Sequence, residues 1–312
     1  MKKPLIILAG PTATGKTALS IDLAKAVNGE IISADSMQVY RHMDIGSAKI
    51  TKEEMDGVPH HLIDVLNPTE EFNVVMFQRM AKEAMEGIYQ RGHIPIVAGG
   101  TGFYIQALAY DIDFTENDSD VTIRRKLEQN ALEQGVEYLH QMLNEVDPVS
   151  AGQIHANNVK RVIRALEFYR QTGRRISEHN EAERKKESPY QLFYYVLNME
   201  RKLLYERIDK RVDAMMEKGL ENEVKSLAAM GCTRDMVSMQ GLGYKEILDY
   251  LEGRLSLEEA VFVLKRDTRH FAKRQITWFK RERDVRWLNL WEFEGGRKDV
   301  LDRILSQLND RP

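Results

Sequence analysis

The chain has 312 residues, of which 43% are hydrophobic and 30% charged, and its formal net charge is −3. These values are ordinary for a soluble globular protein with a real core, and they exclude a nucleic-acid binder that is basic over its whole surface. Cys232 is the only cysteine, which excludes an internal disulfide and a multi-cysteine metal site. No apolar run reaches the length of a membrane span, and the first residues lead straight into a strand rather than a signal peptide. We therefore expect a cytoplasmic protein without membrane association, built as one large α/β domain or as a core with an inserted subdomain.

The first predicted elements enclose a phosphate-binding sequence. Residues 5–9 form an apolar, partly β-branched run that predicts a buried strand, and residues 18–26 have helical spacing. The sequence GPTATGKT between them matches the phosphate-loop pattern at every fixed position. Its residues are Gly10, Pro11, Thr12, Ala13, Thr14, Gly15, Lys16 and Thr17.

In such a unit the loop amides and the helix N-terminus face one anion. Lys16 would contact phosphate oxygens, and the Thr17 hydroxyl would bind Mg²⁺. A glycine-rich turn that merely starts a helix is the structural alternative. A nucleoside triphosphatase, a small-molecule kinase and a transferase that releases diphosphate all fit the loop at this point.

A second predicted strand, residues 30–34, ends in an acidic residue, Asp35. Ligands of doubly wound sheets bind outside the carboxyl ends of the strands, so Asp35 is expected in the same crevice as the phosphate loop. A carboxylate there could take part in catalysis or bind the metal. It could also cap a helical segment over residues 37–41.

A third strand is predicted over residues 60–66, beginning with the adjacent histidines His60 and His61. Neighbouring residues of a strand point to opposite faces, so these two side chains cannot easily share one ion. We expect them to have a structural role.

A second glycine turn follows later in the chain. Residues 73–90 predict a helix, and residues 94–98 predict another buried strand. That strand ends in GGTGFY, residues 99–104, at the carboxyl end of a parallel strand. The amides of this turn and the Thr101 hydroxyl would face the same crevice as the first loop.

Strand patterns stop after about residue 111. Residues 117–144 and 158–172 have helical periodicity, and residues 178–188 form a charged segment that looks mobile. The predicted domains are a catalytic core, residues 1–115 and 189–312, and an α-helical insertion, residues 116–188.

Basic residues gather in two stretches of this slightly acidic chain. Their concentration predicts contact with a polyanion on selected faces, and solvated helix faces with neighbouring acids are the alternative. The first stretch holds Lys160, Arg161, Arg164, Arg170, Arg174 and Arg175, and the second holds Lys265, Arg266, Arg269, Lys273, Arg274, Lys280, Arg281, Arg283 and Arg286.

The chain returns to the sheet after the insertion. A strand is predicted over residues 191–198, followed by helices over 201–218, 220–230 and 256–282, a strand over 285–290 and a helix over 296–308. The predicted fold is therefore α/β, with a P-loop NTPase-like parallel sheet flanked by helices and an α-helical insertion.

Two arginines of this part of the chain, Arg207 and Arg211, share a helix face and could together bind an oxyanion. Pairing with the nearby acids Glu206, Asp209 or Asp213 is the alternative.

Seven segments in this order resemble the tRNA dimethylallyltransferases, also called tRNA isopentenyltransferases or IPP transferases, of the bacterial type. The segments are GPTATGKT (10–17), ISADSMQVYRHMDIGSAK (32–49), PHHLIDV (59–65), GGTGFY (99–104), KRVIRALE (160–167), MQGLGYKE (239–246) and KRQITWFKR (273–281). The resemblance implies transfer of a dimethylallyl group from dimethylallyl diphosphate to N6 of the adenosine on the 3′ side of the anticodon. It also implies tRNAs that read codons beginning with U, the anticodon stem-loop as the bound part, Mg²⁺ as cofactor, no use of ATP, and a monomer.

The resemblance also assigns roles to residues. Asp35 matches the general base, and Thr12, Lys16 and Arg211 match contacts to the diphosphate, which the loop from Gly10 to Thr17 would hold with Mg²⁺ on Thr17. The extruded adenosine would be held by Asp35, Ser36, Met37, Gln38 and Thr101. The anticodon stem-loop would contact Arg124, Val159, Lys160, Arg161, Val162, Ile163 and Arg164.

Two other functions remain as alternatives. A P-loop kinase that phosphorylates a small metabolite would use Asp35 as the base for a hydroxyl, but it has no use for the basic insertion. An RNA-binding NTPase would use the basic stretches and leave Asp35 without a task.

Overall fold

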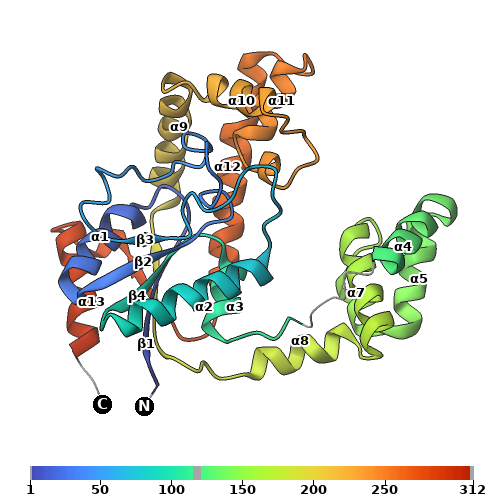
Figure 1. Cartoon of the computed structure of the whole chain (residues 1–312), viewed down its shortest axis with the longest axis horizontal. Coiled ribbons are helices and arrows are strands. Elements are labelled where there is room, and N and C mark those ends of the chain that lie inside the picture. Colours follow the sequence, from blue (N-terminus) through green and yellow to red (C-terminus); the bar gives the residue numbers. More distant parts are fainter. Residues whose placement is uncertain (1, 115–120, 310–312) are drawn as a thin grey trace. The chain divides into compact units, whose positions relative to one another are not determined.

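The structure, a computed structural model of the chain, describes residues 2–114 and 121–309. The chain forms two compact units (Figure 1): a core unit, Met1–Asp111 with Ser188–Pro312, and a helical unit, Ile112–Glu187. The boundary predicted between residues 115 and 116 lies outside the described residues, as does the start of the predicted helix over 117–144.

The core unit is built on a six-stranded sheet in which all paired strands are parallel, which confirms the predicted fold class. The strand order is β3-β2-β4-β1-β5-β6. Ala9 of β1 and Ala34 of β2 are both level with Gly99 of β4, so these three strands end together at one edge of the sheet. The strands are β1 (Pro4–Ala9), β2 (Gly29–Ala34), β3 (His60–His61), β4 (Ile94–Gly99), β5 (Gln191–Asn198) and β6 (Val285–Asn289).

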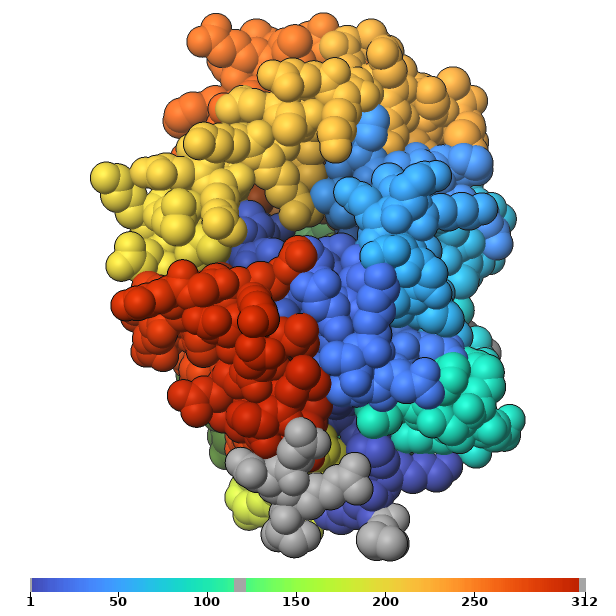
Figure 2. Space-filling view, turned by 90° about the vertical axis from the view of Figure 1, so that its left-hand side faces the viewer, coloured from blue at the N-terminus to red at the C-terminus, as the bar shows by residue number. Residues whose placement is uncertain are grey.

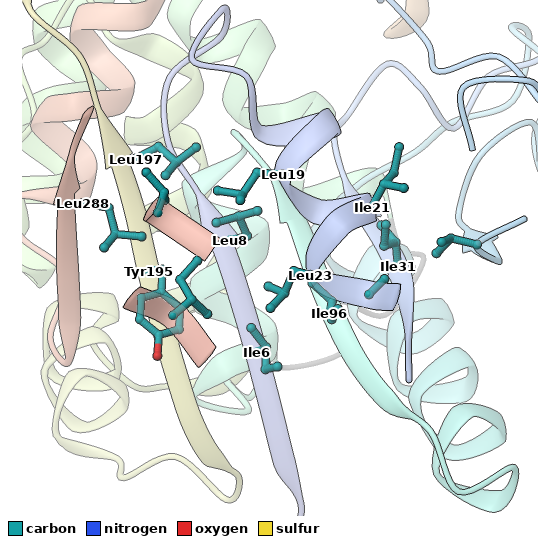
Figure 3. Packing of buried hydrophobic residues seen from close by; sticks show 14 of the residues in the cluster. Ile6, Leu8, Leu19, Ile21, Leu23, Ile31, Ile96, Tyr195, Leu197 and Leu288 are labelled. Atoms are coloured by element: carbon teal, nitrogen blue, oxygen red, sulfur yellow. The ribbon is translucent and has the colours of Figure 1, made fainter. Parts of the chain in front are cut away.

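Helices cover both faces of this sheet. Figure 3 shows Leu19 of α1 next to Leu8 of β1 and Leu23 of α1 nearer to Ile6, and all four side chains are buried. Because side chains alternate along a strand, Leu5 and Ile7 point to the opposite face, and they are fully buried as well. The helices of the core unit are α1 (Lys16–Val27), α2 (Val74–Gln90), α3 (Gly102–Ala109), α9 (Arg201–Glu217), α10 (Leu220–Ala229), α11 (Tyr244–Leu251), α12 (Leu257–Phe279) and α13 (Arg297–Asn309), with short 3₁₀ turns η1 (Ser238–Gln240) and η2 (Leu290–Glu292).

The helical unit has a core of its own. Leu127, Leu139, Leu143 and Leu166 are buried together, as the helical periodicity of this part requires. Its helices are α4 (Val121–Gln134), α5 (Val136–Val146), α6 (Pro148–Gln153), α7 (Val159–Thr172) and α8 (Ile176–Lys185).

The charged segment over residues 178–188, which looks mobile in the sequence, is mostly helical, because α8 occupies most of it. The buried carboxylate of Asp147 accepts hydrogen bonds from the Ser177 backbone N–H at 3.0 Å and from the Ser177 hydroxyl at 2.7 Å. This contact ties the first turn of α8 to the end of α5. An ion pair between Glu181 and Lys185, one turn apart, adds to the helix.

The third strand is much shorter than predicted, since β3 contains only His60 and His61. Leu62 and Asp64 have φ angles of 63° and 55°, and a chain with these angles cannot continue as a strand. Residues 37–41 form turns rather than a helix. No helix in the described ranges is both long and apolar enough to cross a membrane.

Candidate active site

The phosphate loop connects β1 to α1 and is fastened to its own backbone. Gly15 stands at the N-cap of α1 with a φ angle of 90°, a conformation that favours glycine, and the helix begins at Lys16. The Thr14 hydroxyl and the Lys16 ammonium both donate to the carbonyl of Pro11, at 2.9 and 2.7 Å. The lysine ammonium therefore lies over the backbone of the loop.

A cavity of about 580 Å³ opens where β1, β2 and β4 end. Figure 2 shows a hollow on this side of the core unit, between α9 (yellow) and the blue segments near the N-terminus. The cavity wall also includes parts of α9 and α12. Of the site residues predicted from the sequence, those in the wall are Thr12, Ala13, Gly15, Lys16, Thr17, Asp35, Ser36, Met37, Gln38, Thr101 and Arg211. Gly10, Pro11 and Thr14 are not in the wall, and the Pro11 and Thr14 side chains are buried in the loop.

Two cations and one carboxylate influence each other in this cavity. Burial and the nearby Arg211 guanidinium lower the pKa of Lys16 to about 7, against the opposite effect of Asp35. Burial also lowers the pKa of Arg211, and Asp35 again opposes the shift. Arg211 makes no hydrogen bond or ion pair with the described residues. The cavity therefore holds an excess of desolvated positive charge, which an anion would neutralise.

One oxygen of Asp35 is fixed by the backbone that follows it. Its Oδ1 accepts hydrogen bonds from the N–H groups of Met37 at 2.8 Å and Gln38 at 3.3 Å. This is the capping geometry considered from the sequence, although a turn and not a helix follows. Its Oδ2 accepts no hydrogen bond from the part of the chain that the structure describes.

The Gln38 amide is oriented by its neighbours. The Ser33 hydroxyl donates to its Oε1 at 3.1 Å, while its Nε2 donates to the carbonyls of Ser47 and Ala48 at 3.4 and 3.5 Å. The amide of this wall residue is therefore held at both its oxygen and its nitrogen.

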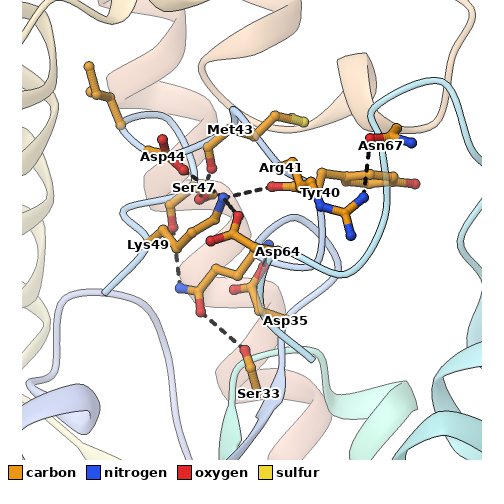
Figure 4. A network of polar contacts seen from close by, with 12 residues as sticks. Ser33, Asp35, Tyr40, Arg41, Met43, Asp44, Ser47, Lys49, Asp64 and Asn67 are labelled. Carbon is orange, nitrogen blue, oxygen red and sulfur yellow. Dashed lines mark hydrogen bonds and ion pairs between the residues drawn. The ribbon is translucent and has the colours of Figure 1, made fainter. Parts of the chain in front are cut away.

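The loop that carries Ser47 and Ala48 is folded around a buried lysine, as Figure 4 shows. Lys49 donates to the carbonyl of Tyr40 at 2.7 Å and pairs with Asp44 and Asp64 at 2.6 Å each. Its side chain is only 4% exposed, so the two carboxylates offset the cost of burying its charge.

A carboxylate that the sequence did not single out closes the same loop. Glu223 of α10 accepts from the N–H groups of Asp44, Ile45 and Gly46 at 2.7 to 3.0 Å. The Tyr244 hydroxyl donates to it at 2.9 Å. A single glutamate on an amphipathic helix carries no sequence signal for such a role, because its partners lie about 180 residues away.

The predicted arginine pair is divided by the structure. Arg211 lines the cavity, whereas Arg207 is exposed and does not. Two acids considered as partners for them pair with α12 instead: Asp209 with Arg269 and Asp213 with Lys265, each at 2.5 Å.

The predicted stem-loop contacts on α7 differ in their exposure. Lys160 and Arg161 are exposed. The side chains of Val162 and Ile163 lie in the core of the helical unit, and Val159 packs against that core, because the apolar face of α7 is what holds the unit together. Val162 and Ile163 therefore cannot offer their side chains to RNA.

Two of the predicted arginines of this unit, Arg124 and Arg164, share one acid. Arg124 pairs with the buried carboxylate of Glu167 at 2.8 Å, and Arg164 lies 3.6 Å from the same group. Lys160 and Arg161 have no ion pair with the described residues. The basic stretch thus contains both paired and unpaired cations.

The second basic stretch, which begins on α12 and continues beyond its end, also contains paired and unpaired cations. Lys265, Arg266 and Arg269 pair with acids. A groove of about 420 Å³ lies farther along the helix, with three cations and an aromatic ring in its wall. Its wall consists of His270, Lys273, Arg274, Thr277, Trp278 and Arg281.

The cavity wall has the donors that a magnesium ion prefers. The exposed Thr17 hydroxyl and the Asp35 carboxylate both present oxygen, and Mg²⁺ usually takes one or two protein oxygens with phosphate and water as its other ligands. Within the described ranges no cluster of three histidine, cysteine or acidic residues could hold a metal. These residues fit an ion that arrives with a phosphate ligand.

Comparison with known proteins identifies the relatives of the chain. A family model described as IPP transferase matches residues 38–282. The tRNA dimethylallyltransferase of Lachnoclostridium phytofermentans is 64% identical over 309 residues, which are 99% of this chain and 98% of that protein. The one from Carboxydothermus hydrogenoformans is 52% identical over 308 residues, 99% of this chain and 97% of that protein.

Solved structures similar to this chain have the same family of names. The full-length tRNA isopentenylpyrophosphate transferase from Bacillus halodurans is 46% identical with a TM-score of 0.74, covering 99% of this chain and 98% of the other. A eukaryotic dimethylallyltransferase acting on tRNA is 31% identical with a TM-score of 0.85, covering 99% of this chain and 80% of the other. The chain belongs to the IPP transferase family, that of the tRNA dimethylallyltransferases.

Proposed function

We propose that the chain transfers the dimethylallyl group of dimethylallyl diphosphate to N6 of the adenosine on the 3′ side of the anticodon in tRNA. The observation that carries this proposal is the placement of Lys16, Arg211 and Asp35 around one cavity. A lysine and an arginine without an ion pair to the described residues suit a diphosphate, and a carboxylate suits the proton that the adenine amine must lose. Membership of the family supports the same reaction.

The donor end of the reaction is the phosphate loop. Loop amides, Lys16 and Arg211 would hold the diphosphate and stabilise the charge that grows on it as its bond to C1 of the dimethylallyl group breaks. The diphosphate leaves with the electron pair of that bond. When bound, Mg²⁺ would be held by Thr17 and by diphosphate oxygens, and it would further neutralise the leaving group.

The acceptor end is the turn after β2. An adenine amine is a poor nucleophile because its lone pair is delocalised into the ring, so removing a proton as N6 bonds to C1 lowers the barrier. Asp35 would take that proton, since its Oδ1 is fixed by backbone N–H groups and its Oδ2 stays available. Gln38 and Thr101, in the same wall, would hold the adenine after its extrusion from the anticodon loop.

The helical unit would bind the anticodon stem-loop. Its exposed, unpaired cations Lys160 and Arg161 suit the phosphates of an RNA backbone. We propose that a monomer suffices, because the core unit of one chain supplies all the residues assigned to the cavity.

A double-label experiment tests this function. The enzyme is incubated with radiolabelled dimethylallyl diphosphate or with γ-labelled ATP, each with and without an anticodon stem-loop. We expect label to move only from the diphosphate donor, and only to RNA. Movement of γ-phosphate to a small metabolite would establish a kinase instead.

Replacement of Asp35 tests its assigned role. Asp35→Asn keeps an oxygen for the N–H groups of Met37 and Gln38 but cannot accept a proton, so we expect turnover to fall by several orders of magnitude with stem-loop affinity nearly unchanged. Single-turnover rates and filter binding measure the two quantities. Asp302→Asn on the exposed side of α13 is the matched control. Equal losses of turnover and affinity would make Asp35 structural.

A further inference from the structure

One side chain of α12 joins the two glycine turns of the cavity. Gln275 is 6% exposed. Its Oε1 accepts a hydrogen bond from the Thr12 N–H at 3.1 Å, and its Nε2 donates to the Gly100 carbonyl at 2.9 Å. One amide therefore connects the phosphate loop with the turn that precedes Thr101.

The contact depends on a close approach that only glycine permits. A Cβ on Gly100 would lie 2.2 Å from Nε2 of Gln275, and a Cβ on Gly102 would lie 2.2 Å from the Trp278 ring. At Gly102 the added atom would meet the Trp278 ring, so a larger residue there would force the ring or the turn to move, whereas at Gly100 it would displace the end of the Gln275 side chain. α12 is thus packed closely against this turn, and the Gln275 amide reaches the Gly100 carbonyl because residue 100 carries no side chain.

We infer that Gln275 is a positioning residue that fixes the distance between the donor and acceptor ends of the cavity. The inference rests on the proposed function, in which Thr12 lies at the diphosphate end and Thr101 at the adenosine end. The bond between C1 and N6 forms only when these atoms approach to roughly 3–3.5 Å, and a displacement of about 1 Å can cost roughly 100-fold in rate. Each glycine turn could move separately if the amide between them were lost.

Replacement by a side chain of similar size without hydrogen-bonding groups tests this role. For Gln275→Met we expect kcat to fall roughly 10- to 100-fold, with KM for dimethylallyl diphosphate and for an anticodon stem-loop each within about 3-fold of wild type. Rates are divided by the folded fraction, measured by circular dichroism. Gln90→Met is the matched control, because Gln90 is exposed at the end of α2, just before the amino end of β4.

A second variant distinguishes positioning from general support of the fold. In Gln275→Glu the ionised carboxylate can still accept from Thr12 but cannot donate to Gly100, whereas the protonated acid can do both, like the amide. We therefore expect the ratio of variant kcat to wild-type kcat to rise as the pH falls from 8 to about 5.5.

Two results would overturn the inference: a Gln275→Met enzyme with wild-type kcat, or a Gln275→Glu ratio that does not change with pH. Failure of the proposed function would be seen separately, because the wild-type enzyme would then yield no prenylated stem-loop at any pH.

Discussion

At the scale of single residues, the charge of Lys16 depends strongly on its surroundings. Its ammonium lies on the carbonyl of Pro11 and close to Arg211, and its pKa of about 7 means that about half of the free enzyme carries it uncharged at neutral pH. A diphosphate raises that pKa, because the charged form gains an anionic partner. Binding should therefore take up a proton when the pH is above 7.

We therefore expect the affinity for dimethylallyl diphosphate to weaken as the pH rises. If only the charged form binds, the dissociation constant of dimethylallyl diphosphate rises roughly 50-fold between pH 7 and pH 9. Calorimetry in buffers of different ionisation enthalpy measures both affinity and proton uptake. Lys16→Arg is the comparator, because a guanidinium stays charged over this pH range. Titration of the ligand affects both enzymes equally, so it cancels when the dissociation constant of one enzyme is divided by that of the other. If the dissociation constants of the two enzymes rose equally with pH, the titration of Lys16 would not be the cause of the loss of affinity.

The loop residues and Asp35 could be predicted from the sequence, because a strand, a glycine turn and a helix dictate where backbone amides point. Gln275 and Glu223 could not be assigned their contacts. Each acts through a hydrogen bond to backbone far away in the chain, and such a contact leaves no local pattern. Arg211 was predicted together with Arg207, and only the register of α9 against the cavity separates them.

At the scale of elements, α7 combines an apolar face with exposed basic residues. Its apolar residues hold the helical unit together, and Lys160 is exposed without an ion pair to the described residues. We expect Lys160→Ala to weaken stem-loop binding and to lower the slope of log K against log salt by about 1, because one phosphate contact is lost. Filter binding over a salt series measures this slope.

A suitable control is Lys298→Ala on α13, an exposed lysine outside the helical unit. Its salt slope should equal that of the wild type. Arg164→Ala is a poorer test than Lys160→Ala, because Arg164 lies 3.6 Å from the buried Glu167 and its loss would disturb the unit itself. An unchanged slope for Lys160→Ala would count against α7 as an RNA contact.

Most elements could be predicted because their apolar residues repeat with the period of a buried strand or a two-sided helix. The strands β1, β2, β4, β5 and β6 all lie within or next to the predicted ranges. The two departures have different causes. The first turn of α8 is held by Asp147, a distant residue between α5 and α6, whereas β3 is cut short locally by positive φ angles at Leu62 and Asp64.

At the scale of the whole molecule, stability should depend on pH through one buried acid. Glu30 of β2 is 2% exposed, and its carboxylate accepts two hydrogen bonds from Arg91 at 2.7 and 2.8 Å and one each from His61 and His93. The bonds from Arg91 above all lower the pKa of Glu30 to about 2 from an ordinary value of 4.5, although burial acts in the opposite direction.

A depressed pKa stabilises the folded state above the unfolded pKa, and this contribution is lost as the pH falls from about 4.5 to about 2. We expect Glu30→Gln to lower the free energy of unfolding by about 3 kcal/mol at pH 7 and by much less at pH 3. Urea denaturation at both values measures the difference. Glu86→Gln, which removes an exposed partner of Lys3, should change little. A pH-independent loss for Glu30→Gln would show that its charge is not what matters.

The chain leaves the core unit after Asp111 and re-enters it at Ser188, where the Ser188 hydroxyl donates to the carbonyl of Ala109 at 2.6 Å. Exit and return are therefore neighbours in the core unit, and every wall residue of the cavity belongs to the sequence before the exit or after the return. Under the proposed function, in which the helical unit binds the RNA, this connection lets the helical unit be replaced as one segment, so that RNA choice and the chemistry of the cavity can change separately.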